Sequence, residues 1–149
     1  MTKKIEIIQA SLEHVEVLTP LFDEYRQFYK QPSDLDSARH FLSKRLANKE
    51  SVIFLASNAE KGVGFVQLYP TFSSITLKRL WILNDLFVLP EIRRQGIGKV
   101  LLDRARQYAS GTGAKGLVLE TAIDNPAQIL YKQMGYKRDQ EFYRYYLNL

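Results

Sequence analysis

Hydrophobic and polar residues follow two different periods along this chain of 149 residues. Apolar and polar side chains that alternate, and short β-branched or aromatic runs, predict strands. Such runs cover residues 4–8, 51–57, 63–69, 76–88 and 115–121, with shorter ones at 136–137 and 141–147. Residues 58–62 are expected to form a hairpin turn, and Pro70 is expected to end the strand before it.

Apolar residues spaced by three and four positions predict helices between these strands. Ser11 is a typical N-cap for the first helix, and Pro20 is expected to interrupt it. Ser33 or Asp34 would cap the second helix. A third helix is predicted from residue 97 to a stop at 111–113, and a short fourth over 125–134.

This order of elements predicts an α/β sandwich with a mixed sheet, which the segments 136–137 and 141–147 would close. The strand, helix and strand between residues 88 and 121 must form a right-handed crossover that joins parallel strands. Ligands of such sheets bind beyond the carboxyl ends of the strands, where neighbours diverge. With 46% hydrophobic residues and no repeat or linker, residues 1–149 are expected to form one domain.

Composition narrows the chemistry. The chain has no cysteine, which excludes disulfides, thiol catalysis and cysteine-ligated zinc. His14 and His40 have no partners at ligand spacing, so no metal site is expected. The sequence has no apolar signal core and no run of the ~20 apolar residues that a membrane helix needs, which predicts a cytoplasmic protein without membrane contact. The chain has a net charge of +5, and its basic residues are scattered among acidic ones. A polyphosphorylated ligand therefore explains the excess of positive charge at least as well as nucleic acid does.

One stretch carries most of the chemical information. The β-rich run 83–90 is followed by Arg93-Arg94-Gln95-Gly96-Ile97-Gly98, which opens the third helix. Glycines at a strand-to-helix turn let backbone N–H groups approach a phosphate, and the helix dipole favours an anion there. The glycines alone favour an ordinary strand-to-helix turn, and only the whole stretch points to an anion site. A dinucleotide fingerprint is excluded because Leu101 stands at its third glycine site, and a P-loop is excluded because Val100 follows Lys99.

The spacing Arg/Gln-x-x-Gly-x-Gly/Ala after such a strand resembles the acetyl-coenzyme A (acetyl-CoA) loop of the GNAT superfamily of N-acetyltransferases. The likeness continues through residues 119–122 and through the run 125–136, which is similar to the superfamily's Ala-x-x-Leu-Tyr-x-x-x-Gly-Phe/Tyr helix. Residues 65–70, 83–88 and 138–143 look most like the branch that holds the yeast histone and polyamine acetyltransferases. The resemblance implies a mostly antiparallel central sheet flanked by helices, with a parallel strand pair splayed at the acetyl-CoA site.

The resemblance also implies which residues bind the cofactor. Backbone groups of Leu86, Phe87 and Val88 would pair with the pantetheine arm, and the loop and helix start would hold the pyrophosphate. In the branch, an asparagine one residue further upstream contacts the arm, so either Asn125 or Asp124 takes that part here, and Asn125 is our choice. The cofactor-binding residues expected are Leu86, Phe87, Val88, Arg93, Arg94, Gln95, Gly96, Ile97, Gly98, Lys99, Asn125 and Tyr131.

Acetyl transfer to an amine needs an acid for the departing thiolate and a route for the ammonium proton. Tyr131 is the candidate acid, because a phenol of pKa ~10 can protonate a thiolate. Its spacing with Ala127, Leu130 and Met134 is also that of a buried helix face, and the family match decides between these interpretations. The superfamily's strand glutamate is replaced by Ile82, so no base stands out, and ordered water is as good a candidate as a carboxylate.

Several carboxylates and phenols on the first two helices suit a cationic acceptor. The candidate substrate residues are Glu24, Tyr29 and Asp85. Alternation along the strand predicts that the Asp85 side chain points to the opposite face from Ile82. The sequence therefore predicts acetyl transfer from acetyl-CoA to a primary amine, such as a polyamine or a lysine-bearing peptide. A non-catalytic acyl-CoA-binding or sensing module is the alternative. The aromatic tail could pair between subunits, which favours a homodimer.

Overall fold

A computed structural model describes residues 4–59 and 61–149 of the chain. Five strands form one sheet in the order β1-β2-β3-β4-β5, in which every pair is antiparallel except the parallel pair β4 and β5. The strands are β1 (Ile5–Gln9), β2 (Val52–Asn58), β3 (Lys61–Ser73), β4 (Lys78–Val88) and β5 (Gly116–Val118). The helices are η1 (Leu12–His14), α1 (Val15–Phe28), α2 (Leu35–Ala47), η2 (Pro90–Ile92), α3 (Ile97–Gly111) and α4 (Ala127–Gln133).

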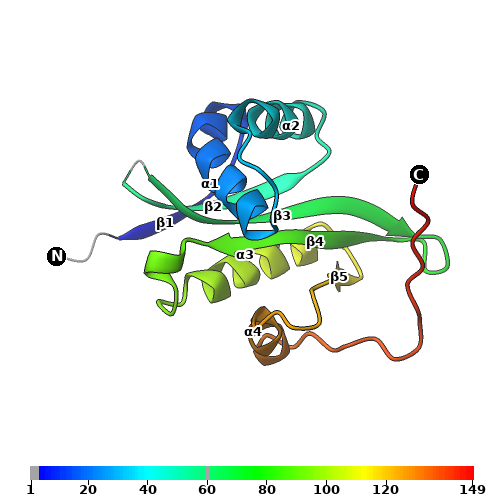
Figure 1. Cartoon of the computed structure of the whole chain (residues 1–149). Helices are drawn as coiled ribbons and strands as arrows, with labels where there is room; N and C mark the ends of the chain where they lie inside the picture. The colour runs from blue at the N-terminus through cyan, green and yellow to red at the C-terminus, as the bar shows by residue number, and fades with distance from the viewer. Residues whose placement is uncertain (1–3, 60) are drawn as a thin grey trace.

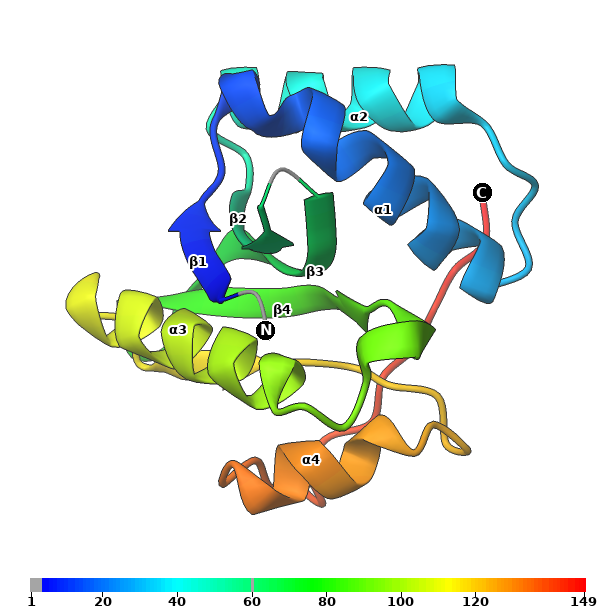
Figure 2. The ribbon, with the colours of Figure 1, turned by 90° about the vertical axis from the view of Figure 1, so that its left-hand side faces the viewer.

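The sheet lies between two helical layers (Figures 1 and 2). Helices α1 and α2 cover one face, and α3 covers the other, with α4 beyond it at the β5 side. The buried side chains Leu18, Phe54, Phe65 and Leu101 join the helices to the sheet. This arrangement confirms the predicted mixed α/β architecture with its single parallel pair.

Pro20 does not interrupt the first helix, contrary to the expectation from sequence. Helix α1 runs without a break from Val15 to Phe28, with Pro20 inside it. A proline lacks the N–H that would bond the carbonyl four residues earlier, here that of Glu16. Both residues are exposed, so water can satisfy this carbonyl.

Pro70 does not end its strand either. Strand β3 continues to Ser73, and Pro70 is paired with Trp81 of β4. On its other side, β3 pairs with β2 only as far as Leu68. Beyond that point β3 is an edge on the β2 side, where a proline removes no ladder hydrogen bond.

A bulge divides β4 into two halves that face opposite ways. Gln67 of β3 is paired with Asp85, but the next residue, Leu68, is paired with Leu83, so Asn84 is the extra residue. Such a bulge reverses the face to which the following side chains point. Trp81 accordingly packs on Tyr108 of α3, whereas Phe87 packs on Tyr25 of α1. The prediction that Ile82 and Asp85 point to opposite faces assumed a regular strand. It is therefore wrong, because the extra residue brings both side chains to the same face.

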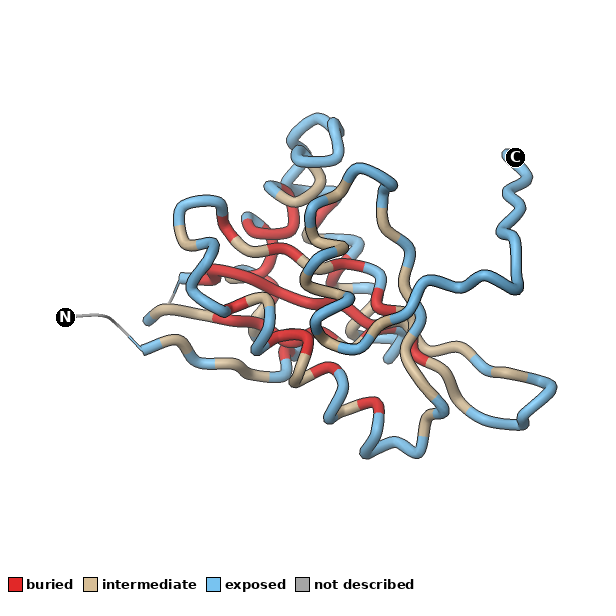
Figure 3. Tube along the Cα trace, turned by 90° about the horizontal axis from the view of Figure 1, so that it is seen from below, coloured by how far each residue is buried: buried red, intermediate tan, exposed pale blue. Residues whose placement is uncertain are grey.

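The segments 136–137 and 141–147 do not close the sheet, as the sequence had predicted. Residues 137–149 form neither helix nor strand and are exposed throughout (Figure 3). The tail leaves the body after α4 and extends past the sheet to the C-terminus (Figure 1). Alternation of apolar and polar residues indicates that a segment can form a strand. The segment also needs a neighbouring strand to pair with, and the tail has none at its position in this structure.

Candidate active site

A cavity of about 500 Å³ lies where β4 and β5 diverge. The parallel pairing ends at Ile82 and Val118, so the backbone of β4 from Leu83 onward is separated from residues 119–121. The cavity reaches from α1 to α4 across this split. It is lined by Tyr25, Phe28, Tyr29, Leu83, Asn84, Leu86, Phe87, Val88, Ile92, Arg93, Arg94, Gly96, Ile97, Gly98, Lys99, Glu120, Thr121, Asn125, Pro126, Ala127, Leu130, Tyr131 and Gln133.

The N-terminus of α3 forms one end of this cavity. Gly96 is its N-cap with φ 81° and ψ 6°, a left-handed conformation that favours glycine, and the space where its Cβ would stand is open. The space at Gly98 is tighter, because an added Cβ would lie 3.3 Å from Cδ2 of Leu130 on α4 and that side chain would have to shift. Arg93, Arg94 and Lys99 add positive charge to the free N–H groups of the helix. An anion such as a pyrophosphate fits this end.

Arg93 is held across the middle of the cavity. Its Nε donates a hydrogen bond of 2.9 Å to the Val88 carbonyl, and its guanidinium lies over the rings of Phe28 and Phe87 at 5.8 and 5.7 Å. The Val88 carbonyl is a group that the family resemblance assigns to the pantetheine arm. A ligand that pairs with this part of β4 would therefore meet the Arg93 side chain at this carbonyl.

Helix α4 and the loop before it supply the wall opposite β4. The Oδ1 atom of Asn125 accepts a hydrogen bond of 2.9 Å from the Ala127 N–H, which starts the helix and leaves the amide Nδ2 as a donor for a ligand. Asp124 is exposed and is not among the lining residues. Tyr131 lines the cavity, and burial raises its pKa to about 12, with smaller contributions from Tyr29 and Tyr136. Its phenol is therefore protonated at neutral pH.

Four aromatic side chains form the α1 end of the cavity. Tyr25 and Tyr29 have ring centroids 5.1 Å apart, Phe28 and Tyr29 are 5.2 Å apart, and Tyr25 and Phe87 are 5.8 Å apart. The negative faces of such rings attract an alkylammonium group. The sequence reasoning missed Phe28, although its place one helical turn after Tyr25 could have indicated it.

A buried carboxyl group lies behind these rings. Asp85 is buried, and it accepts hydrogen bonds from Gln67 Nε2 at 2.7 Å, from Asn84 Nδ2 at 3.1 Å and from the Tyr25 hydroxyl. Burial raises the pKa of Asp85, and the hydrogen bonds oppose this shift. Burial and the charge of Asp85 raise the pKa of Tyr25 as well. The Tyr25 hydroxyl thus connects Asp85 to the cavity, a link that depends on the bulge at Asn84.

The structure brings most of the predicted site residues together. All the expected cofactor residues line the cavity except Gln95. Of the three candidate substrate residues, Tyr29 lines it, Asp85 lies behind Tyr25, and Glu24 is exposed on α1 outside the lining. The neighbouring acid Asp23 is structural, because it accepts hydrogen bonds from the Ser33 hydroxyl at 2.6 Å and the Asp34 N–H at 2.8 Å.

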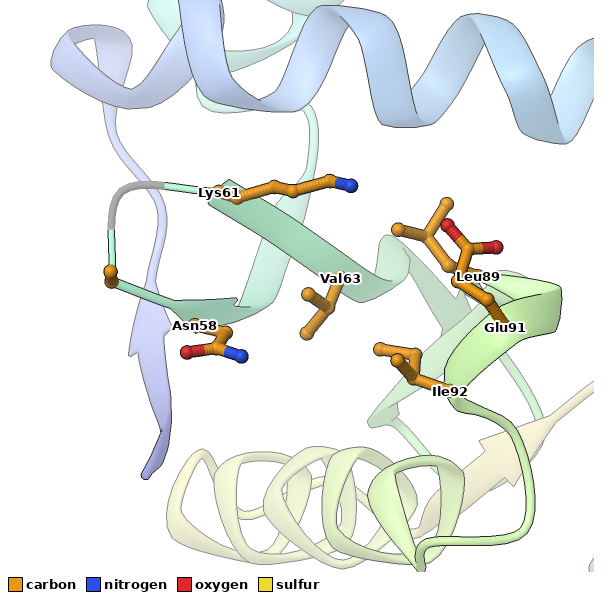
Figure 4. Close-up of a pocket in the computed structure, with 7 residues that line it drawn as sticks. Asn58, Lys61, Val63, Leu89, Glu91 and Ile92 are labelled. Carbon is orange, nitrogen blue, oxygen red and sulfur yellow. The ribbon is translucent and has the colours of Figure 1, made fainter. Parts of the chain in front are cut away.

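A second hollow, more open to solvent, lies on the other side of Ile92 (Figure 4). It is formed between the end of the β2–β3 hairpin and η2, and Val63 and Ile92 point toward each other across it. None of its lining residues belongs to the predicted site. Within residues 4–59 and 61–149, no three His, Asp or Glu side chains gather to hold a metal, and no helix is long and apolar enough to cross a membrane.

Comparison with known proteins decides the family. The family described as "Acetyltransferase (GNAT) domain" matches residues 49–138. The chain belongs to the GNAT acetyltransferases. It is 49% identical over 146 residues to the uncharacterized N-acetyltransferase YhfO of Bacillus subtilis, which covers 97% of this chain and 98% of that protein. A probable acetyltransferase of Haemophilus influenzae is 37% identical over 119 residues, covering 79% and 82%.

A solved structure agrees with this assignment across nearly the whole fold. The crystal structure of a probable acetyltransferase is 48% identical to this chain, with a TM-score of 0.91 and 97% of both chains covered. As a GNAT member, the protein is an acetyl-CoA-dependent N-acetyltransferase. The cavity between β4 and β5 is its candidate active site.

Proposed function

We propose that this GNAT enzyme acetylates a primary amine that is cationic in solution, either a polyamine or the lysine side chain of a peptide. The observation that carries the proposal is the aromatic cluster of Tyr25, Phe28, Tyr29 and Phe87 at one end of the same cavity as the anion-binding helix start. Ring faces attract an alkylammonium group by about 0.5–2 kcal/mol, depending on its desolvation. The resemblance to the yeast histone and polyamine branch supports the same acceptor class.

A named relative also supports an amine on an alkyl chain. The thialysine N-epsilon-acetyltransferase of Caenorhabditis elegans is 28% identical over 138 residues, covering 90% of this chain and 84% of that protein. Thialysine carries a primary amine at the end of a flexible chain. Such a chain would fit against the rings of the cluster where they line the cavity, with its amine directed toward β4.

The residues present fit coenzyme A. The open space at Gly96 and the charges of Arg93, Arg94 and Lys99 suit its pyrophosphate. The backbone of residues 86–88 has no strand partner on the β5 side, which suits the pantetheine arm. When bound, the cofactor supplies an activated thioester carbonyl to the amine. Backbone N–H groups of β4 would then stabilise the negative charge that develops on the carbonyl oxygen.

We assign the role of the acid to Tyr131. It lies on α4, across the cavity from β4, and its pKa of about 12 keeps the hydroxyl protonated. A protonated phenol in a site that excludes water can donate a hydrogen bond to a developing thiolate and deliver the proton as the C–S bond breaks.

We assign the pair Tyr25 and Asp85 the role of accepting the proton of the ammonium group. Because the Tyr25 hydroxyl donates to Asp85, its oxygen is available to accept from an amine in the cavity. One proton would pass from the amine to Tyr25 as another passes from Tyr25 to Asp85. Burial raises the pKa of Asp85, which makes this carboxylate a stronger base than one in water.

The test is a panel of amines assayed by the thiol that acetyl transfer releases. The chain has no cysteine, so a thiol reagent detects released coenzyme A without a background from the protein. Spermidine and lysine-bearing peptides are expected to give a kcat/KM at least tenfold above that of glutamate or a neutral amine. Equal or faster turnover of the acidic and neutral amines would refute the acceptor class.

Calorimetry with acetyl-CoA separates the remaining outcomes. Binding of acetyl-CoA without turnover of any amine would favour a non-catalytic acyl-CoA sensor. Failure of folded protein to bind acetyl-CoA at all would refute the assignment of the cavity as the cofactor site.

A further inference from the structure

Gln67 is a fully buried polar side chain in the middle of the sheet. It is 0% exposed, and it stands on β3 directly opposite Asp85 of β4. Residues directly opposite on paired antiparallel strands point to the same face. Two positions away on that face lie Phe65 and Phe87, which both pack on Tyr25 of α1. An amide in this apolar layer is costly unless its hydrogen bonds to water are replaced.

The amide of Gln67 is bound at one end. Its Nε2 donates a hydrogen bond of 2.7 Å to Oδ2 of Asp85. Its Oε1 is also buried and has no hydrogen-bond partner among the described residues. A buried acceptor without a partner destabilises the folded state, whereas an apolar side chain of the same size carries no such penalty. The hydrogen bond to Asp85 is therefore what this side chain contributes at its position.

Asp85 depends on such donors for its charge. In residues 4–59 and 61–149, no Lys, Arg or His forms an ion pair with it. Burial raises the pKa of Asp85, and hydrogen bonds from Tyr25, Gln67 and Asn84 lower it. Tyr25 gives up its own proton in the proposed route, so two donors stay in place throughout. Asn84 is exposed and lies 3.1 Å away, so the shorter, buried bond of Gln67 is the stronger restraint.

The titratable side chains around Asp85 are phenols that carry no charge at neutral pH. They are Tyr25 of α1 and Tyr69 of β3. Burial raises the pKa of both phenols, and the charge of Asp85 adds to each rise. Arg45 of α2 acts on Tyr69 in the opposite direction but leaves its pKa raised. Hydrogen bonds therefore carry the stabilisation of the Asp85 carboxylate.

We propose that Gln67 is a positioning residue for acetyl transfer, whose amide holds the Asp85 carboxylate ionised and aimed at the Tyr25 hydroxyl. The inference rests on the proposed function, in which these two side chains take up the proton of the ammonium group. Gln67 exchanges no proton itself. It keeps Asp85 able to accept one in a layer where burial alone favours the protonated acid. The bulge at Asn84 lies immediately beside this pair and fixes its register.

Carbon-13 NMR of the aspartate carboxyl groups measures the protonation of Asp85 directly. Its resonance is assigned by its absence from Asp85→Asn. Gln67→Met replaces the amide by an apolar chain of similar length and should raise the pKa of Asp85 above that of the parent. Gln27→Met is the matched control. The Gln27 amide donates to Oδ2 of Asp23 at 3.1 Å, so its loss should leave the pKa of Asp85 unchanged.

The pH profile of kcat in the thiol-release assay shows the consequence for catalysis. A base must be ionised to accept a proton, so the ascending limb of Gln67→Met should lie at higher pH than that of the parent. On this limb kcat should fall about 10–100-fold, and above it kcat should return toward the parent value. Gln27→Met should keep the parent profile. A merely structural role of Gln67 predicts a loss of kcat at every pH, with the limb unmoved.

The outcomes separate this inference from the proposed function. An Asp85 pKa in Gln67→Met equal to that of the parent would overturn the inference, while a parent that acetylates amines would leave the proposed function standing. A parent that acetylates no amine would refute the proposed function. The NMR comparison would then still decide whether Gln67 holds Asp85 ionised.

A second variant covers the case in which circular dichroism shows that Gln67→Met has not folded. Gln67→Glu keeps the shape of the side chain and sets a second carboxyl group against Asp85. Two carboxyl groups in contact share one proton, so the pair should take up a proton at a higher pH than Asp85 does in the parent. Proton uptake at the pH of the parent would count against the inference.

Discussion

Removal of the Tyr131 hydroxyl tests the chemistry most directly. Tyr131→Phe keeps the ring, whose centroid lies 5.8 Å from that of Tyr136, so the packing between the two should survive. With a pKa of about 12, only about one phenol in 10⁵ is ionised at pH 7, so the wild-type residue acts as a donor. Loss of a positioned acid typically costs 10²–10⁴ in rate.

The expected effect lies in kcat and not in binding. A loss of about 10²–10⁴ corresponds to about 2.7–5.4 kcal/mol of activation free energy. The thiol-release assay should show this fall in kcat, whereas calorimetry should show a dissociation constant for acetyl-CoA within a few-fold of that of the parent. Any rise of kcat with pH in the parent should also be seen in the variant, because the pKa of Tyr131 lies above the assayed pH range.

Tyr136→Phe provides the matched control. Tyr136 is the other member of this aromatic pair but does not line the cavity, and its buried hydroxyl has no partner among the described residues. Its kcat should stay within about threefold of the parent. A Tyr131→Phe variant that is as active as Tyr136→Phe would refute the acid role of Tyr131.

Three further changes test the surroundings of the site. Gly96→Ala forces a left-handed residue to carry a Cβ and should cost about 1–2 kcal/mol in denaturant unfolding and weaken acetyl-CoA binding, whereas Gly111→Ala in the same helix should be neutral or slightly stabilising. Tyr25→Phe should lower kcat/KM by about 10²–10⁴ if Tyr25 passes the proton to Asp85; an unchanged value would favour ordered water. Asp85→Asn should gain stability relative to the parent as the pH rises. The folded pKa of Asp85 is raised, so its stability contribution is complete below the unfolded pKa and is lost as the pH passes the folded pKa. A relative gain by the parent at high pH would contradict the shift.

Local chemistry explains which parts of the site could be predicted from the sequence. The loop from Arg93 to Gly98 needs a residue in the left-handed conformation just before the helix. Gly96 adopts this conformation without help from distant residues, so the sequence alone could indicate it. The stripe of Leu130 and Tyr131 likewise depends only on helical spacing. The two prolines were misjudged because their cost depends on what stands beside them. The cost of Pro20 disappears because water can reach the exposed Glu16 carbonyl. The cost of Pro70 disappears because β3 has no neighbouring strand on the β2 side at this point.

By itself, then, the sequence determined the helices and strands as far as α4, their order, the glycine-bearing turn before α3 and the family, because periodicity and turn chemistry act within a few residues. Only the tertiary structure decided that a bulge at Asn84 turns Asp85 toward Tyr25, and that Phe28 joins an aromatic wall opposite Tyr131. It also decided that the strand-like tail lies apart from its own sheet. Strand pairing and facing depend on neighbours distant in the chain, and a single inserted residue reverses every side chain that follows.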